Sequence, residues 1–201
     1  MAVLVLVPTG VAFGGKLAGL FEGTPAPPDV SSVFAQSNRM ADMAVQQGFA
    51  SQWPHADVSK AHGVIEIQTP DGPEDMWAAP DDLGGQCTFI DFANDPPGKD
   101  GMPGFGDCPR SAPLTDEKIG FGDEWAYTHP DVLTIYGSVY VDAATVRLTF
   151  DDGSTVTLPV VEHLYLGSAP RGTKVDAVTA FDAAGNQVAT DVLRPSGSTR
   201  G

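Results

Sequence analysis

The chain has 201 residues, 42% of them hydrophobic, so it is long enough for one sizeable buried core or for one core with a smaller satellite. Its 26 acidic and 11 basic residues give a net charge of −15, which excludes binding to a nucleic acid backbone, because that needs clustered lysine and arginine. The 23 glycines and 17 prolines favour a β-rich protein with many loops over a helical one.

The N-terminal segment, residues 1–21, begins with an apolar run at Ala2–Val7 that proline and glycine soon interrupt. The run is shorter than the about 20 apolar residues of a spanning helix, and no basic residue precedes it as in a signal peptide. We interpret the segment as an anchor remnant or a signal-type segment, with a buried strand as the alternative. Residues 10–16 have the spacing of a phosphate-binding loop, but Leu17 replaces the required Ser or Thr, so nucleotide binding is not expected.

Residues 22–62 are predicted to form a proline-rich tether followed by one helix. Asp29 is a suitable N-cap for a helix over 30–48. Its apolar residues fall roughly on one face, which should pack on the core: Val33, Phe34, Met40, Met43 and Ala44. The remainder, up to His62, has no regular pattern.

Residues 63–131 are predicted to contain a three-strand meander and a long loop. The strands, separated by turns rich in Asp, Gly and Pro, cover residues 63–69, 74–79 and 87–92. In the first strand, alternation directs Ile65 and Ile67 toward a core and Glu66 and Gln68 toward water.

The two cysteines, Cys87 and Cys108, bracket the loop that leaves the third of these strands. A disulfide between them would close about 20 residues and stabilise the fold by about 3 kcal/mol. A disulfide that closes such a loop is typical of an exported protein. Two free thiols or half of a metal site are the alternatives, although the spacing fits no C-x-x-C pattern.

The C-terminal half, residues 132–194, carries the clearest β pattern. Three hairpins are predicted, joining 133–141 with 144–150, the latter with 155–160, and 174–181 with 187–193. A further short strand follows at 163–166. Residues 195–201 are expected to form a disordered tail. The predicted fold is mainly β: an antiparallel immunoglobulin-like β-sandwich in the C-terminal half, preceded by the meander and one N-terminal helix.

Side-chain alternation defines the predicted inner face of this sandwich. Val146, Leu148 and Phe150 should lie inside, with Arg147 and Thr149 outside. On the partner strand, Val156 and Leu158 should lie against them, and Val178 and Phe181 should close the opposite sheet.

Candidate catalytic residues are His129, His163, Ser138 and Ser168, with the surrounding aspartates. None belongs to a G-x-S-x-G or H-E-x-x-H motif, so no catalytic residue is assigned. Acidic pairs occur at Asp81–Asp82 and Asp151–Asp152, and Asp95 and Asp100 lie in the long loop. The ordered spacing of a calcium loop is absent, and turn formation explains Asp before Gly, so at most weak Ca²⁺ binding and no cofactor are expected.

Five aromatic residues near the entry to the predicted sandwich form the candidate surface for a ligand or partner: Trp125, Tyr127, Tyr136, Tyr140 and Tyr165. Several of them exposed on one sheet face would mark a binding surface. Ordinary packing in the core and rim of the sandwich is the alternative.

Several short motifs stand out along the chain: Gly14–Lys16, Leu20–Pro27, Phe34–Arg39, Met76–Pro80, Gly84–Cys87, Tyr136–Val139 and Val146–Gly153. Their arrangement resembles that of uncharacterised anchored proteins of high-GC Gram-positive bacteria. This resemblance implies an extracytoplasmic β-rich module and no catalytic residues.

We therefore interpret the chain as a non-enzymatic binding or sensing module that is membrane-anchored or secreted. Its expected partner is an envelope protein or a glycan, and only the N-terminal segment should contact the membrane. The alternative is an envelope or secreted hydrolase on a β-sandwich scaffold. That function would require His163 or His129 to meet a carboxylate and a Ser or Thr in one pocket.

Overall fold

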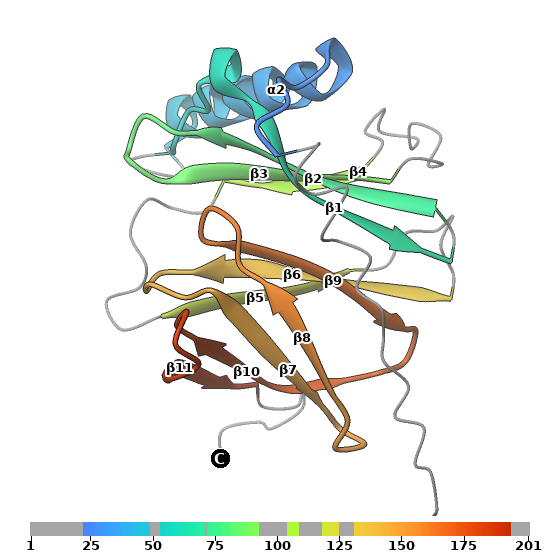
Figure 1. Cartoon of the computed structure of the whole chain (residues 1–201). Coiled ribbons are helices and arrows are strands. Elements are labelled where there is room, and N and C mark those ends of the chain that lie inside the picture. Colours follow the sequence, from blue (N-terminus) through green and yellow to red (C-terminus); the bar gives the residue numbers. More distant parts are fainter. Residues whose placement is uncertain are drawn as a thin grey trace, which may run out of the picture.

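A computed structural model describes residues 22–48, 53–70, 72–92, 104–108, 118–124 and 131–193. Within these residues the chain forms one α-helix, one short 3₁₀ helix and three antiparallel sheets. Figure 1 shows that the helix and the sheets are stacked as four layers. The predictions for the segments 1–21 and 195–201 lie outside the described residues.

The outermost layer is the helix α2 (Pro28–Gln46), which lies on one face of the first sheet (Figure 1). Proline at its first position costs little, because the first N–H groups of a helix have no partner within the helix. Asp29 lies in the first turn, where a negative charge is favourable, but Pro27 is the N-cap and no side chain caps the helix. The predicted capping by Asp29 is therefore wrong.

The face that α2 buries also differs from the predicted one. Val30, Phe34 and Ala41 are buried and lie on one side of the helix, and Val30 and Phe34 pack in the core against the first sheet. Met40 and Met43 are 58% and 56% exposed, so the prediction that they are core contacts is wrong. Met43 follows Phe34 by nine residues, which is about two and a half turns, and it therefore points away from the sheet.

The first sheet has the order β1-β2-β3-β4, with β1 (His62–Thr69), β2 (Gly72–Pro80), β3 (Gln86–Phe92) and β4 (Gly104–Asp107). The predicted meander is confirmed, and β4 adds a strand from the loop that was expected to lack regular structure. The 3₁₀ helix η1 (Val58–Lys60) precedes β1.

The N-terminal end of β1 departs from simple alternation. A bulge between Gly63 and Ile65 places both Val64 and Ile65 in the core. The preceding chain is also fixed to this strand, because the N–H groups of Gly23 and Ala26 donate to the carbonyls of Gly63 and Ala61. The segment predicted as a tether is therefore attached to the edge of the sheet.

The second sheet has the order β5-β6-β9, with β5 (Ile119–Glu124), β6 (Val132–Val139) and β9 (Leu164–Pro170). The third sheet has the order β11-β10-β7-β8, with β7 (Thr145–Phe150), β8 (Thr155–Pro159), β10 (Val175–Phe181) and β11 (Gln187–Val192). The predicted hairpins β7–β8 and β10–β11 are confirmed. Gly153 and Gly185 close them at φ of 80° and 82°, which glycine adopts at little cost.

The predicted hairpin between 133–141 and 144–150 is wrong. β6 pairs with β5 and β9, whereas β7 pairs with β8 and β10. The connection crosses from one sheet to the other: the N–H of Tyr140 donates to Lys118 beside β5, and the N–H of Ala144 donates to Phe181 of β10.

The predicted inner face of β7 is confirmed. Val146, Leu148 and Phe150 are at most 4% exposed, Arg147 is exposed and Thr149 is half-buried. Alternating burial of this kind is expected where one side of a sheet packs on another layer and the other side meets solvent.

The residues predicted to oppose this face lie elsewhere. Val178 pairs with Leu148 and Phe181 pairs with Thr145, so both belong to the same sheet as β7 and neither closes an opposite sheet. Val156 pairs with Leu148 as expected but is 39% exposed, whereas Leu158 is buried. The opposing surface comes from the second sheet, whose Ile135 and Tyr165 share one hydrophobic core with β7.

Three hydrophobic cores fill the spaces between the four layers. The core under α2 includes Val30, Phe34, Trp77, Cys87 and Phe89. The core between the first and second sheets includes Val64, Ile65, Met76, Ile90, Leu164 and Leu166. The core between the second and third sheets includes Ile135, Leu148, Phe150, Tyr165 and Val178. The first sheet is thus covered on both faces, which explains why four consecutive residues of β2, Met76 to Ala79, are all buried.

Candidate functional site

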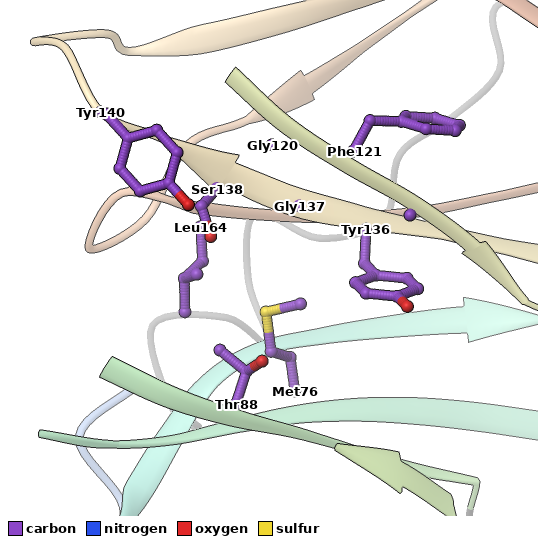
Figure 2. A pocket seen from close by; sticks show the side chains of 10 residues that line it. Met76, Thr88, Gly120, Phe121, Tyr136, Gly137, Ser138, Tyr140 and Leu164 are labelled. Carbon is purple, nitrogen blue, oxygen red and sulfur yellow. The ribbon is translucent and has the colours of Figure 1, made fainter. Parts of the chain in front are cut away.

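A cavity of about 250 Å³ lies between the first and second sheets, and we refer to it as the inter-sheet cavity. In Figure 2, Met76 of β2 and Thr88 of β3 border it from the first sheet, and Tyr136 and Ser138 of β6 border it from the second. Tyr140, immediately after β6, completes this side. Residues 136, 138 and 140 point the same way because side chains alternate along a strand.

The glycines of β5 make room for this cavity. A Cβ atom at Gly122 would lie 2.4 Å from Cζ of Tyr136, so the tyrosine ring packs directly on bare backbone. A Cβ at Gly120 would lie 3.5 Å from the hydroxyl oxygen of Tyr140, an ordinary contact distance. Glycine inside a strand often marks a place where a ligand or another chain segment approaches closely.

Tyr165 supports this region from the core and does not line the cavity. It is fully buried, and its hydroxyl donates a 2.9 Å hydrogen bond to the carbonyl oxygen of Gly120. Burial raises the pKa of Tyr165 far above its ordinary value, so the hydroxyl stays protonated. Gly137 allows this packing, since a Cβ there would lie 2.4 Å from the Tyr165 hydroxyl. Of the two alternatives for Tyr165, packing in the core therefore holds, and Tyr165 is not part of an exposed aromatic surface.

The structure brings together two of the five aromatic residues predicted as a binding surface. Tyr136 and Tyr140 border the inter-sheet cavity, and Tyr140 is 40% exposed. Trp125 and Tyr127 lie outside the described residues. These two tyrosines thus border a cavity between two sheets, not a flat face of a sandwich.

The described residues around the inter-sheet cavity supply hydroxyl groups and apolar groups but no side chain that is charged at neutral pH. The hydroxyls belong to Thr88, Tyr136, Ser138 and Tyr140, and the apolar contacts come mainly from Met76 and Leu164. Hydroxyl groups can both donate and accept hydrogen bonds. The cavity therefore suits an uncharged ligand better than an ion.

The candidate catalytic residues do not form a catalytic group in the described part of the chain. The Nδ1–H of His163 donates to the carbonyl of Val139 at 3.1 Å, and no hydrogen bond joins this histidine to Ser138 or Ser168 there. Ser138 borders the cavity, whereas Ser168 lies further along β9. His129 lies outside the described residues.

One aspartate of each acidic pair accepts hydrogen bonds from main-chain N–H groups within a turn. Oδ1 of Asp81 accepts hydrogen bonds from the N–H groups of Leu83 and Gly85, and Oδ1 of Asp152 accepts one from Ser154. Among the residues that the structure describes, no group of three or more His, Cys, Asp or Glu side chains is placed to hold a metal ion. Asp95 and Asp100 lie outside those residues.

Cys87 and Cys108 form a disulfide, the pairing that the sequence predicts. Cys87 is buried on the side of β3 that faces α2, and Cys108 directly follows β4. Oγ of Ser37 on α2 lies 3.6 Å from Sγ of Cys108. The disulfide therefore fastens β4 to β3 beneath the helix, on the other side of the first sheet from the inter-sheet cavity.

The residues that line the cavity but were not recognised as site residues from the sequence include Met76, Thr88, Gly120 and Gly122. The glycines alternate with Ile119 and Phe121, which is a strand pattern of period two. Because glycine has a low strand propensity, this segment was not predicted as a strand. Met76 and Thr88 come from another sheet, and no local pattern indicates that contact.

Within the described part of the chain, no helix is long and apolar enough to cross a membrane. Comparison of the chain with models of protein families, with curated proteins and with solved structures found no match.

Proposed function

We propose that the protein is an extracytoplasmic binding module without catalytic activity, anchored to the membrane or secreted. Its ligand site is the inter-sheet cavity. The observation that carries this proposal is the construction of the cavity, in which Tyr136 and Tyr140 flank Ser138 above the glycines of β5. Concave sites with aromatic walls and a few converging polar groups are typical of ligand binding.

The extracytoplasmic location is supported by the disulfide between Cys87 and Cys108, because disulfides persist in oxidising compartments and are rare in the cytosol. The resemblance to anchored envelope proteins agrees with it. We infer that the partner is a component of the envelope, either a protein or a glycan.

The second and third sheets together support the immunoglobulin-like sandwich at a finer level. Seven strands, β5 to β11, form two antiparallel sheets of three and four strands that share one hydrophobic core. Sandwiches of this kind cluster their loops at the two ends and occur in many cell-surface domains. In this proposal the sandwich presents one side of the cavity, and the first sheet covers it.

Co-sedimentation of the purified full chain with insoluble envelope fragments of a high-GC Gram-positive bacterium tests the proposal. We expect the unaltered protein to sediment with the fragments and Gly120→Val to remain in solution, since the added side chain would occupy the cavity. Thr157→Val, at an exposed position of β8, is the control and should sediment normally. Circular dichroism would check that each variant is folded. Equal sedimentation of Gly120→Val, or none by the unaltered protein, would contradict the proposal.

A further inference from the structure

We infer that the ligand of the inter-sheet cavity is a single uncharged sugar ring, either free or as one residue of a glycan. This inference rests on the proposed binding function of the cavity and specifies the class of ligand. Three properties of the cavity lead to it: the absence of charge on its described lining, the distribution of hydroxyl groups, and its dimensions.

The absence of charged side chains from the described lining of the cavity disfavours ionic ligands. None of the described lining residues is a lysine, arginine or histidine that could pair with a phosphate or carboxylate, and none is an aspartate or glutamate that could pair with an amine. A buried charge without a partner is costly, so a charged ligand would lose its hydration without compensation. The net charge of −15 further disfavours anions.

The hydroxyl groups match a ligand that carries hydroxyls itself. Thr88 contributes one from the first sheet, and Tyr136, Ser138 and Tyr140 contribute three from the side of the second (Figure 2). Each hydroxyl offers one donor and two acceptor positions, so it can keep a partner within the protein and still bind a ligand. A sugar ring carries several groups with this same dual capacity, at its rim.

The apolar groups match the remainder of such a ring. Side chains at every second position of a strand are about 6.6 Å apart, so the Cα atoms of Tyr136 and Tyr140 are about 13 Å apart, with Ser138 midway. This spacing leaves room for one six-membered ring over Ser138, and the C–H groups of that ring would contact the tyrosines. Met76 and Leu164 supply further apolar contacts. The volume of about 250 Å³ has no room for an extended chain.

A neutral peptide is the main competing ligand, and the topology disfavours it. Peptides that bind to sheets pair with the unoccupied main-chain groups of an edge strand. Tyr136 and Ser138 stand on β6, the central strand of the second sheet, and Thr88 stands on β3, which pairs with β2 and β4. The main-chain groups of these strands are therefore already paired, and recognition over them uses side-chain hydroxyls. The edge strand β5 also lines the cavity, and the peptide probe below tests pairing with it.

Titration of the full chain with neutral methyl glycosides of glucose, galactose, mannose and N-acetylglucosamine, followed by NMR, tests the inference. We expect at least one of these glycosides to bind with a Kd of about 1 mM, which is the affinity usual for a ligand of so few atoms. Glucuronate and glucosamine, which carry charges, should bind at least tenfold more weakly than the best neutral glycoside. N-acetyl-dialanine amide serves as the neutral peptide probe and should not bind.

Three variants of cavity residues and one control variant locate the binding. Tyr140→Phe keeps the ring but removes the hydroxyl and should weaken glycoside binding about threefold to tenfold. Gly120→Val should abolish glycoside binding. Gly120→Ala, whose Cβ makes only ordinary contacts, should weaken it and replaces the larger variant in the experiment if that variant does not fold. Thr157→Val should bind like the unaltered protein.

The outcomes separate this inference from the proposed function. If Gly120→Val loses envelope sedimentation but the unaltered protein binds no glycoside, or binds the peptide instead, the ligand class is wrong and the binding function stands. If glycosides bind equally to Gly120→Val, they bind elsewhere, and the inference is overturned. If the unaltered protein neither sediments nor binds a glycoside, both proposals fail.

Discussion

Asp75 lies in the middle of a row of three carboxylates on the first sheet, with Glu66 on one side and Asp91 on the other. Burial, together with the charges of Glu66 and Asp91, raises the pKa of Asp75 to about 7. Its Oδ1 atom is buried and has no hydrogen-bond partner among the described residues. Ionisation of this side chain therefore opposes folding.

The stability of the protein should consequently depend on pH. Because the folded-state pKa lies above the ordinary value of 3.8, the folded state binds the extra proton between about pH 4 and 7, and stability falls as the pH rises through this window. Asp75→Asn should remove this fall and stabilise the protein at pH 8 by about 1 kcal/mol, a value reduced for partial exposure. Urea unfolding at pH 5 and 8 measures the effect.

A turn aspartate provides the control for this experiment. The pKa of Asp152 is lowered by its hydrogen bonds with Ser154, so Asp152→Asn should not stabilise the protein at pH 8. If Asp75→Asn kept the same dependence on pH as the unaltered protein, the carboxylate row would not control stability.

The sequence identifies each of these acids but not their arrangement. Glu66, Asp75 and Asp91 lie in three predicted strands, and only the register between the strands makes them neighbours. That register continues without a break from the turn, where Thr69 pairs with Gly72, and the bulge shifts only the pairs of His62 and Gly63. A turn longer or shorter by one residue would exchange the two faces of the strand, and the alternating pattern of β1 does not determine the length of the turn.

At the scale of single elements, the hairpins could be predicted and the longer-range pairings could not. β7–β8 and β10–β11 are joined by short turns with Gly153 and Gly185, so the signal and the structure are both local. β6 pairs with β5 and β9, and its pairing with β9 crosses the whole β7–β8 hairpin. An alternating pattern shows that a strand exists but does not identify its neighbour.

The alternation in β7 leads to a direct comparison of two adjacent residues. Leu148 is 1% exposed in the core between the second and third sheets, whereas Thr149 is half-buried. Leu148→Ala should cost about 2–5 kcal/mol, because it removes apolar contacts and leaves a cavity. Thr149→Ala should cost about 1 kcal/mol or less. Chemical denaturation would measure both, and equal losses would mean that β7 buries both of its faces to the same extent.

At the scale of the whole molecule, the turn between β8 and β9 connects the layers. Glu162 and His163 adopt φ of 49° and 67°, a region in which residues other than glycine are strained. The carboxylate of Glu162 accepts hydrogen bonds from Nε2 of His62 at 2.9 Å and from Gln86 at 3.3 Å. Because His62 and Gln86 belong to the first sheet, this turn links it to the two sheets that β8 and β9 join.

This link should strengthen at low pH. Burial lowers the pKa of His62, but its hydrogen bonds with the Lys60 carbonyl and Glu162 outweigh that effect, and the net pKa is raised. The stabilisation is fully present below the ordinary histidine pKa of 6.5 and is lost as the pH rises through the folded-state value. Glu162→Gln should therefore cost about 0.5–1 kcal/mol at pH 5.5 and almost nothing at pH 8.5. Urea unfolding curves of both proteins at the two pH values would check this, and an equal cost at both would contradict it.

The candidate site shows the same division between local and long-range information. Tyr136, Ser138 and Tyr140 are spaced by two in the sequence, so their common face could be inferred from the alternation of a strand. The opposite wall, with Met76 and Thr88, lies about 50 residues earlier in the chain and reaches the cavity only because the first sheet packs on the second. Only the assembled layers therefore show a cavity instead of a flat aromatic surface.

The NMR signals of the methionine methyl groups test most directly whether the inter-sheet cavity is the ligand site. Met76 borders the cavity, and Met40 and Met43 lie exposed on α2, on the far side of the first sheet, as internal controls. With ¹³C-methyl-labelled protein, Met76→Leu assigns the signal. On titration with the best-bound neutral glycoside, we expect the Met76 signal alone of these three to shift and to saturate. Movement of the Met40 or Met43 signals with Met76 unchanged would contradict a binding site between the sheets.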